Sequence, residues 1–228
     1  MLRLLKNLSG FEALLWFVSS AAIVISAVLS GGSDPVSVIA SLIGVSSLIF
    51  IAKGHFSGQA LMIVFAVLYG IISIEQHYYG EAFTYLGMTA PSSLFTMIVW
   101  IRHPYKNGDT VEIMSISNRR LILIILFTAV ITAASCFIMY ALGNAQPEVS
   151  TVSVATSFCA SSLMFFRSPY YALAYAANDI VLIVLWVLAA FSDHSCIPVA
   201  VCFTAFLFND FYGFYSWRKM KAAQSREK

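Results

Sequence analysis

Residues 169–191 read PYYALAYAANDIVLIVLWVLAAF, and Asp179 is the only Asp, Glu, Lys or Arg among them. A helix needs about 20 mostly apolar residues to cross the hydrocarbon core of a bilayer. A strand of a membrane barrel would instead alternate between polar and apolar residues over about 10 positions. The stretch therefore predicts a transmembrane helix, and the chain contains eight runs of this kind. They cover residues 11–30, 36–52, 56–74, 82–101, 121–142, 149–166, 169–191 and 195–217.

The composition of the whole chain indicates an all-α integral membrane protein. Of its 228 residues, 60% are hydrophobic and 11% are charged, and the mean hydropathy is +0.83. A typical soluble domain has about 25% charged residues, so this composition argues against a water-soluble enzyme. The net charge of +2 is too small to indicate a nucleic acid as partner. The four cysteines lie in or beside apolar runs without the spacing of a zinc site, so we expect neither a metal site nor a disulfide framework.

The positions of the basic residues test the count of eight helices independently. If the N-terminus is cytoplasmic, eight crossings place all 13 Lys and Arg residues on the cytoplasmic side. Membrane proteins retain basic loops on that side, and one helix fewer would scatter these residues over both faces. We therefore expect both termini to be cytoplasmic. The basic residues are Arg3, Lys6, Lys53, Arg102, Lys106, Arg119, Arg120, Arg167, Arg218, Lys219, Lys221, Arg226 and Lys228.

Landmarks near the helix ends recur once along the chain, at offsets of 114 to 117 residues. The matched landmarks are Ser46-Ser47-Leu48 with Ser161-Ser162-Leu163, Lys53 with Arg167, and Trp100-Ile101-Arg102 with Trp217-Arg218. The offset aligns the helices of 36–101 with those of 149–217 and leaves 121–142 as a connector. Such parallel repeats are typical of transporters whose site lies between the two halves, near the bilayer midplane. The ranges are 1–34 for an additional N-terminal helix, 35–102 for the first three-helix repeat, 103–143 for a cytoplasmic loop and the connector helix, 144–217 for the second repeat, and 218–228 for a basic cytoplasmic tail.

Polar residues inside the predicted helices mark a candidate ligand site. An ionisable group within a bilayer is costly, so each one is a functional candidate. Asp179 and Asp210 lie within predicted helices, and each directly follows an asparagine. Tyr171 and Tyr175 lie one helical turn apart and continue the face that carries Asn178. The candidate site residues are Tyr171, Tyr175, Asn178, Asp179, Asn209 and Asp210 in the second repeat, and Gln59 and Tyr85 in the first.

This set of side chains suits a flat ring joined to a hydroxylated sugar. Aromatic side chains stack on such a ring, while amide and carboxylate groups hydrogen-bond to sugar hydroxyls. A cationic ring would also offset the cost of burying a carboxylate. The alternative is that the asparagine and aspartate pairs form only interhelical hydrogen bonds, which stabilise a membrane bundle without binding a ligand. We expect no catalytic residue, metal or cofactor among them.

The segment Gly87-Met88-Thr89-Ala90-Pro91 lies at mid-depth in the helix predicted for 82–101. Proline removes a backbone donor, so we expect an interruption of this helix, with a freed carbonyl that is buried or faces a cavity. Gly58, Gly70 and Gly213 are expected to allow close packing of helices rather than to bind a ligand.

The sequence also lacks the parts of an energy-driven pump. The longest predicted cytoplasmic loop, at about 103–120, is too short for a nucleotide-hydrolysing domain, and the chain contains no P-loop. The four histidines all fall in loops, two on each side of the membrane, so no single site gathers them. Neither ATP-driven pumping nor enzymatic activity is therefore expected.

Taken in order over both repeats, the polar and aromatic residues resemble the PnuC family of bacterial vitamin transporters. The resemblance covers roughly residues 35–220. It implies a SWEET-like fold of three helices, one connector and three helices, with the additional N-terminal helix outside this core. The stretches that carry it are Gly54 to Tyr69, Tyr79-Gly80-Glu81, Pro169 to Asp179, and Asn209 to Trp217.

The resemblance implies facilitated diffusion of nicotinamide riboside across the bacterial cytoplasmic membrane. It also implies that a cytoplasmic riboside kinase traps the substrate by phosphorylation. Asn178 matches a substrate-contacting asparagine of the family, whereas Tyr171 stands where many members have tryptophan.

Several functional alternatives stay open. Members of the family carry thiamine, riboflavin or deoxynucleosides, so each of these is an alternative substrate. Import coupled to protons or sodium through Asp179 or Asp210 is a second alternative, and a non-transporting membrane scaffold is a third. The expected partners are the small-molecule substrate, the lipid bilayer and the kinase, and a homo-oligomer is left open.

Overall fold

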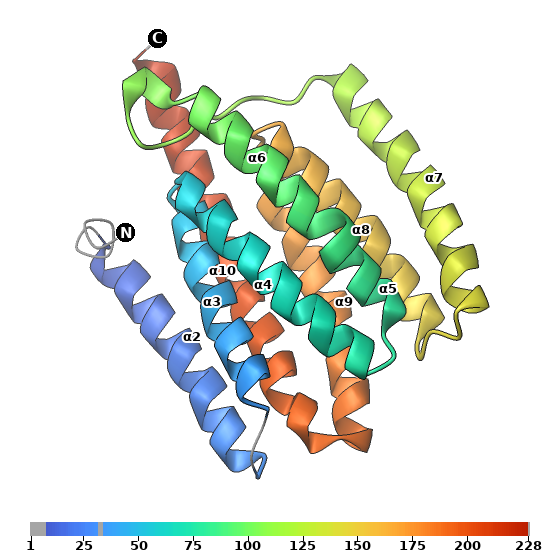
Figure 1. Ribbon diagram of the computed structural model, residues 1–228. Helices are drawn as coiled ribbons and strands as arrows, with labels where there is room; N and C mark the ends of the chain where they lie inside the picture. The colour runs from blue at the N-terminus through green and yellow to red at the C-terminus, as the bar shows by residue number, and fades with distance from the viewer. Residues whose placement is uncertain (1–7, 32–33, 228) are drawn as a thin grey trace.

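The computed structural model describes residues 8–31 and 34–227, which form an all-α bundle (Figure 1). All eight predicted apolar runs are helical in it, which confirms the predicted fold class. The segments α5, η1 and α6 form one continuous pass, and short 3-10 turns η2 (Tyr105–Asn107) and η3 (His194–Cys196) lie in the connections. The helices are α2 (Gly10–Leu29), α3 (Pro35–Ala52), α4 (Phe56–Glu75), α5 (Tyr79–Ala82), η1 (Phe83–Thr89), α6 (Ala90–Arg102), α7 (Asn118–Ala141), α8 (Pro147–Phe165), α9 (Tyr171–Ser192) and α10 (Ile197–Arg226).

Seven passes within the described residues are long and apolar enough to cross a membrane, and α8 is the exception. Helix α8 carries Ser150, Ser153, Ser157 and Ser161 at spacings of three or four residues, so these serines share one face. All four are buried. Because α8 packs against α7 and α9, its polar face contacts protein rather than lipid. The polar character of α8 is therefore compatible with a place inside the bundle.

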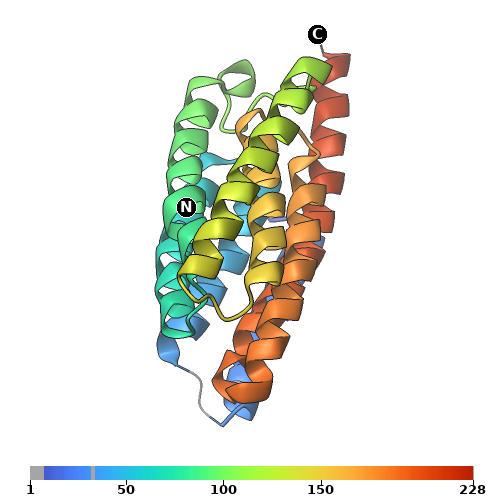
Figure 2. The same ribbon diagram turned by 90° about the vertical axis from the view of Figure 1, so that its right-hand side faces the viewer.

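The helices of the two predicted repeats close into a ring. Helix α3 packs on α4, α4 on α6, α6 on α8, α8 on α9, α9 on α10, and α10 on α3. Exchanging α3 with α8, α4 with α9 and α6 with α10 gives the same set of neighbours, which is the pattern expected of two repeats related by a two-fold axis. Helix α7 lies outside the ring beside α8, and α2 lies on the opposite side against α3 and α10 (Figures 1 and 2).

The predicted interruption at Gly87–Pro91 is a π-helical turn rather than a break. In η1 the N–H of Ala90 donates to the carbonyl of Tyr85, five residues earlier, instead of four. Pro91 has no N–H, and the wider turn before it accommodates the missing bond without ending the helix. The chain therefore crosses in one pass, and Tyr85 and Thr89 lie in the widened turn.

The loops that carry most of the basic residues meet at one end of the bundle. His55, in the turn between α3 and α4, forms a bridge with Thr110 after α6. The N–H of Met114 donates to the carbonyl of Arg167, between α8 and α9, over 3.0 Å. This gathering at one end is the arrangement that the charge pattern predicts. Arg3, Lys6 and Lys228 lie outside the described residues.

Helix α10 continues to Arg226, so the predicted basic tail is helical from Arg218 to that residue. Gln224 fixes this extension to the loop after α6. Its Oε1 accepts from the N–H of Ile113 over 2.9 Å, and its Nε2 donates to the carbonyl of Val111 over 3.1 Å. These bonds to main-chain groups, and not the local sequence alone, hold the end of α10 in place.

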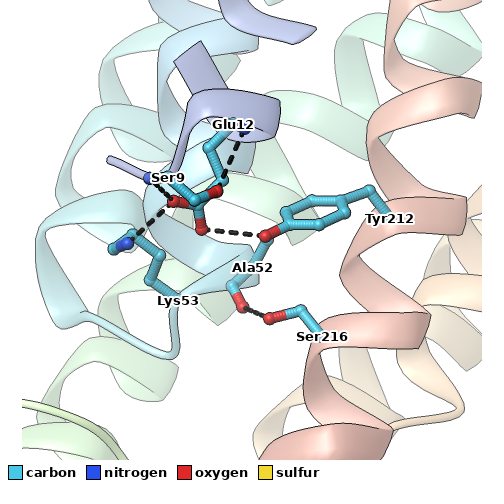
Figure 3. Close-up of polar contacts among 6 residues, drawn as sticks. All are labelled: Ser9, Glu12, Ala52, Lys53, Tyr212 and Ser216. Carbon is cyan, nitrogen blue, oxygen red and sulfur yellow. Dashed lines mark hydrogen bonds and ion pairs between the residues drawn. The ribbon is translucent and has the colours of Figure 1, made fainter. Parts of the chain in front are cut away.

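Glu12 attaches the additional N-terminal helix to both halves of the ring (Figure 3). Its carboxylate accepts from the N–H of Ser9, which caps α2, over 2.7 Å. The same oxygen lies 2.9 Å from Nζ of Lys53 at the end of α3, while the other accepts from the hydroxyl of Tyr212 on α10 over 2.9 Å. Glu12 is 4% exposed. Helix α2 therefore spans the seam between α3 and α10 and is anchored by a buried carboxylate.

The seam beneath α2 is itself closed by bonds to the last carbonyls of α3. The hydroxyl of Ser216 donates to the carbonyl of Ala52 over 2.7 Å (Figure 3), and Nε1 of Trp217 donates to that of Ile51 over 2.9 Å. Carbonyls in the last turn of a helix lack partners further along it, so side chains of a neighbouring helix can satisfy them. These bonds join the two halves directly.

We expect Glu12→Ala to lower the free energy of unfolding by about 1–3 kcal/mol, since it removes a buried acceptor shared by α3 and α10. For a chain of this size that corresponds to a fall of roughly 2–10 °C in Tm. The measurement is thermal unfolding of the purified protein in detergent. The control is Glu148→Ala at an exposed carboxylate in the first turn of α8, and an equal loss in both variants would contradict the anchoring role.

The structure supports a packing role for the glycines at the helix contacts. A Cβ atom added to Gly58 would lie 2.6 Å from the backbone nitrogen of Ile51 and 2.8 Å from the backbone oxygen of Ser47. At Gly70 it would lie 2.5 Å from Cγ of Leu86, and at Gly213 it would lie 3.2 Å from a neighbouring hydroxyl. Helix α4 thus approaches the backbone of α3 as closely as only glycine allows.

We expect Gly58→Ala to destabilise the fold by about 1–3 kcal/mol, because the added methyl group meets backbone atoms that cannot turn away. Gly10→Ala is the matched control, since no atom lies within 4 Å of a Cβ added there. Thermal unfolding of both variants tests this, and a neutral Gly58→Ala would show that the contact between α3 and α4 is looser than described.

Candidate functional site

A narrow cavity lies at the centre of the ring and receives side chains from all six helical passes of the two repeats. The space in which the centre of a water molecule fits is only about 20 Å³, so the cavity is nearly filled by its own side chains. A nucleoside-sized ligand would need the lining side chains or the helices to move apart. The lining residues are Leu48, Ile51, Met62, Phe65, Tyr85, Thr89, Ser157, Met164, Tyr175, Asn178, Asp179, Phe206 and Asp210.

Five of the predicted site residues share this lining: Tyr85, Tyr175, Asn178, Asp179 and Asp210. They come from η1, α9 and α10, so both repeats contribute. The structure thus brings together residues that lie more than a hundred positions apart in the sequence.

Asn209 and Gln59 lie outside the lining. Asn209 faces the additional helix α2, where its Nδ2 lies 3.3 Å from the hydroxyl of Ser19. Adjacent residues of a helix point about 100° apart, so Asn209 faces away when Asp210 faces inward. Gln59 lies behind the wall of the cavity, with its Nε2 2.8 Å from Sδ of Met164, which does line the cavity.

Tyr171 is also outside the lining, one turn of α9 away from Tyr175. It is 1% exposed and packs edge-on against Trp217, with ring centroids 4.7 Å apart. The ring centroids of Tyr171 and Tyr175 are 6.3 Å apart. Tyr171 therefore packs against Tyr175 from the side on which the basic loops lie.

The structure adds site residues that were not among the predicted ones. Ser157 belongs to the regular series of serines on α8, and this periodicity is a signal that could have placed it on an inward face. Phe65 and Phe206 also line the cavity. Nothing in an apolar run distinguishes a residue that faces a cavity from one that faces lipid, so these two could not be selected from the sequence.

Asp179 and Asp210 give the cavity its chemical character. Their carboxyl groups lie close enough for direct interaction, and both residues are buried. The Oδ2 atom of Asp179 accepts no hydrogen bond from a described residue. Among the described residues that line the cavity there is no Lys, Arg or His. Two facing carboxyls without a basic partner require a proton or a cationic ligand to balance their charge.

Two hydroxyl groups of α8 orient the amide of Asn178. Its Oδ1 lies 2.8 Å from Oγ1 of Thr156 and 3.2 Å from Oγ of Ser153. The amide nitrogen makes no hydrogen bond with the described residues and can donate to an oxygen atom of a ligand. The hydroxyl of Tyr175, which lies on α9 like Asn178, is 2.9 Å from that of Ser161 on α8.

Aromatic rings form the wall opposite these polar groups. The ring of Tyr85 packs against Tyr69 with centroids 4.3 Å apart and against Phe65 at 5.8 Å. Behind them the indole N–H of Trp186 donates to the hydroxyl of Tyr69. A flat ring can pack on this wall while its polar substituents reach the amide and carboxyl groups. Charge, hydrogen bonding and stacking are therefore available in one enclosed place.

Membrane-spanning helices that close into a ring around a central polar and aromatic cavity define this protein as a multi-pass membrane transporter. Residues 34–219 match a family model whose description is "Nicotinamide mononucleotide transporter". The chain belongs to this family, the PnuC family of transporters.

Named relatives and a solved structure agree with this membership. The nicotinamide riboside transporter PnuC of Neisseria mucosa is 27% identical over 188 residues, which are 80% of this chain and 71% of the relative. The nicotinamide riboside transporter PnuC of Haemophilus influenzae is 22% identical over 184 residues, 80% of this chain and 78% of the relative. The crystal structure of the vitamin B3 transporter PnuC overlays with a TM-score of 0.82 at 22% identity, covering 96% of this chain and 94% of that one. The overlay supports the fold.

Proposed function

We propose that this protein carries nicotinamide riboside across the membrane and that the Asp179–Asp210 pair is the feature that selects it. Nicotinamide riboside consists of a flat, positively charged pyridinium ring joined to ribose. Its charge matches a cavity that holds two carboxyls and, among the described lining residues, no basic side chain. Its ring fits the aromatic wall around Tyr85, and its sugar and carboxamide fit the amide of Asn178.

The Asp179–Asp210 pair also favours nicotinamide riboside over nicotinamide mononucleotide. The mononucleotide is the compound in the description of the matching family model. A mononucleotide adds a phosphate group with one to two negative charges. In the cavity that phosphate would face two carboxyl groups and would find no basic partner among the described lining residues. The two named bacterial relatives are riboside transporters, which agrees with this choice.

The contacts we assign to the ligand come from the five predicted residues that line the cavity. Asp179 and Asp210 balance the ring charge, Tyr85 packs on the ring, and Asn178 and Tyr175 hydrogen-bond to the sugar or the carboxamide. Tyr171 and Gln59 support this set from behind, by their contacts with Trp217 and Met164. Asn209 contacts α2 and receives no ligand contact in this proposal. The ranges 35–102 and 144–217 are the units that move relative to each other in this proposal.

Transport is proposed to be uniport, with the substrate trapped after entry by a cytoplasmic riboside kinase. Phosphorylation converts the cation into a molecule that the acidic cavity disfavours, so the product does not return by the same route. We place the protein in the bacterial cytoplasmic membrane with both termini inside, since the basic loops gather at one end of the bundle.

One observation favours a second candidate, transport coupled to an ion. Asp179 has a carboxylate oxygen without a hydrogen-bond partner among the described residues, and it faces a second carboxyl. Such a pair can bind a proton or a sodium ion as well as a cationic substrate. The unpartnered oxygen makes this the main competitor of uniport.

We expect Asn178→Ala to reduce riboside binding by at least tenfold, the effect of losing a hydrogen-bonding group that faces the ligand. The measurement is thermal stabilisation of the purified wild type and variant by nicotinamide riboside. The wild type is also tested with nicotinamide mononucleotide, nicotinamide, thiamine, riboflavin and deoxynucleosides. A bound ligand at a hundredfold excess over its Kd raises apparent stability by about 2.7 kcal/mol.

Asn209→Ala is the matched control for this substitution, because Asn209 belongs to the same residue type but faces α2. It should keep riboside affinity within about twofold while lowering stability slightly.

Stabilisation of the wild type by another vitamin instead of the riboside would identify that vitamin as the substrate, and stabilisation by the mononucleotide would refute the charge argument. No stabilisation by any of them would favour the scaffold alternative.

In liposomes that contain the purified protein but no kinase, we expect riboside to enter until its concentrations inside and outside are equal. The membrane potential is held at zero, with equal potassium concentrations and valinomycin on both sides, because uniport of a cation would otherwise respond to the potential. Under this condition uniport has no driving force for accumulation beyond the substrate's own gradient. Initial rates should not change when proton and sodium gradients are collapsed with ionophores. Accumulation against the riboside gradient that ionophores abolish, and that Asp179→Asn removes, would establish ion coupling instead.

A further inference from the structure

Glu81 is a buried carboxyl that the assigned ligand contacts leave unused. It lies on α5 within a membrane-spanning pass and is fully buried. Its Oε1 atom has no hydrogen-bond partner among the described residues, and its Oε2 atom lies 3.2 Å from the hydroxyl of Ser153 on α8. A carboxyl held in such a place is costly and indicates a function.

The position of Glu81 is fixed by the residue before it. The N–H of Gly80 donates to Oδ1 of Asn144 over 3.0 Å, and Nδ2 of Asn144 donates to the hydroxyl of Ser150 on α8 over 3.1 Å. A Cβ atom at Gly80 would collide with Sδ of Met139 and would lie 2.9 Å from Cβ of Ser150. Helix α5 is therefore pressed against α7 and α8, and this close contact brings Glu81 to Ser153.

Ser153 lies between two acceptors but has only one proton to donate. Its Oγ is 3.2 Å from Oε2 of Glu81 and 3.2 Å from Oδ1 of Asn178. A hydroxyl group donates one hydrogen bond, so Ser153 can serve only one of these two oxygens at a time. When Ser153 donates to Glu81, Asn178 keeps Thr156 as its donor at 2.8 Å and retains a free lone pair on Oδ1.

We propose that Glu81 is a positioning residue for the ligand contact at Asn178 and that it acts through Ser153. By accepting the hydrogen bond of Ser153, Glu81 leaves Oδ1 of Asn178 able to accept a hydrogen bond from a ligand N–H or O–H. Without an acceptor at position 81, both α8 hydroxyls donate to Oδ1 and saturate it. The inference rests on the proposed function, because Asn178 must contact the ligand.

The test is a double-mutant cycle on the full chain, read as the Kd for nicotinamide riboside from thermal stabilisation. Glu81→Leu, which removes the acceptor, should weaken binding about fivefold to tenfold, the loss of about one hydrogen bond. Glu81→Leu combined with Ser153→Ala should bind within about twofold of the wild type, since Ser153 no longer donates to Asn178 and Thr156 still does. A merely structural role for Glu81 would give a double variant at least as weak as the single one, and that result would overturn the proposal.

Three further measurements keep the result interpretable. Glu75→Leu, at an exposed carboxylate at the end of α4, should bind like the wild type. If riboside does not stabilise the wild type but thiamine or riboflavin does, the proposed substrate fails and the same cycle is run with that vitamin. On ligand-free protein, Asn178→Ala should lower the Tm more in the Glu81→Leu background than in the wild type, because Asn178 then has two donors. Equal shifts in both backgrounds would overturn the inference without reference to any ligand.

Discussion

The burial of Asp179 and Asp210 away from lipid is the constraint on which the rest of the structure depends. A charged or polar group in the hydrocarbon region must find its partners inside the protein, because the bilayer offers none. The ring of α3, α4, α6, α8, α9 and α10 encloses both carboxyls in one cavity, where they face each other instead of lipid. The proposed transport function uses the same enclosure, since a cavity that lacks a basic lining residue in the described chain suits a cation.

The same constraint explains features that look unrelated in the sequence. The serines of α8 make that helix too polar for a lipid-facing span, and the ring turns them toward protein. The π-helical turn before Pro91 widens one pass where Tyr85 and Thr89 enter the cavity. Glu12 shows the rule at the periphery, because its carboxylate is balanced by Lys53 and Tyr212 and secures α2 over the seam of the two halves.

Much of the fold could be predicted because bilayer thickness fixes the length of a span. The eight runs, the order of three helices, a connector and three helices, and the weak point near Pro91 all follow from run length, charge and recurring landmarks. The candidate site was predicted in part. Asp179, Asp210, Asn178, Tyr175 and Tyr85 line the cavity, whereas Asn209, Gln59 and Tyr171 lie behind it. Sequence reasoning selects polar residues in apolar runs but does not give the rotation of each helix about its axis, and that rotation separates Asn209 from Asp210.

Composition and spacing establish a helical membrane protein with acidic, amide and aromatic groups inside the bilayer, and they predict two related halves. These properties depend on composition and on spacing along one helix, which a sequence records directly. Only the tertiary structure decided which of these groups meet. It brought Asp179 and Asp210 together, placed Phe65 and Phe206 in the wall, and set Ser153 between Glu81 and Asn178. Such encounters depend on how neighbouring helices are rotated and how closely they approach, and those quantities are settled by packing between segments far apart in the chain.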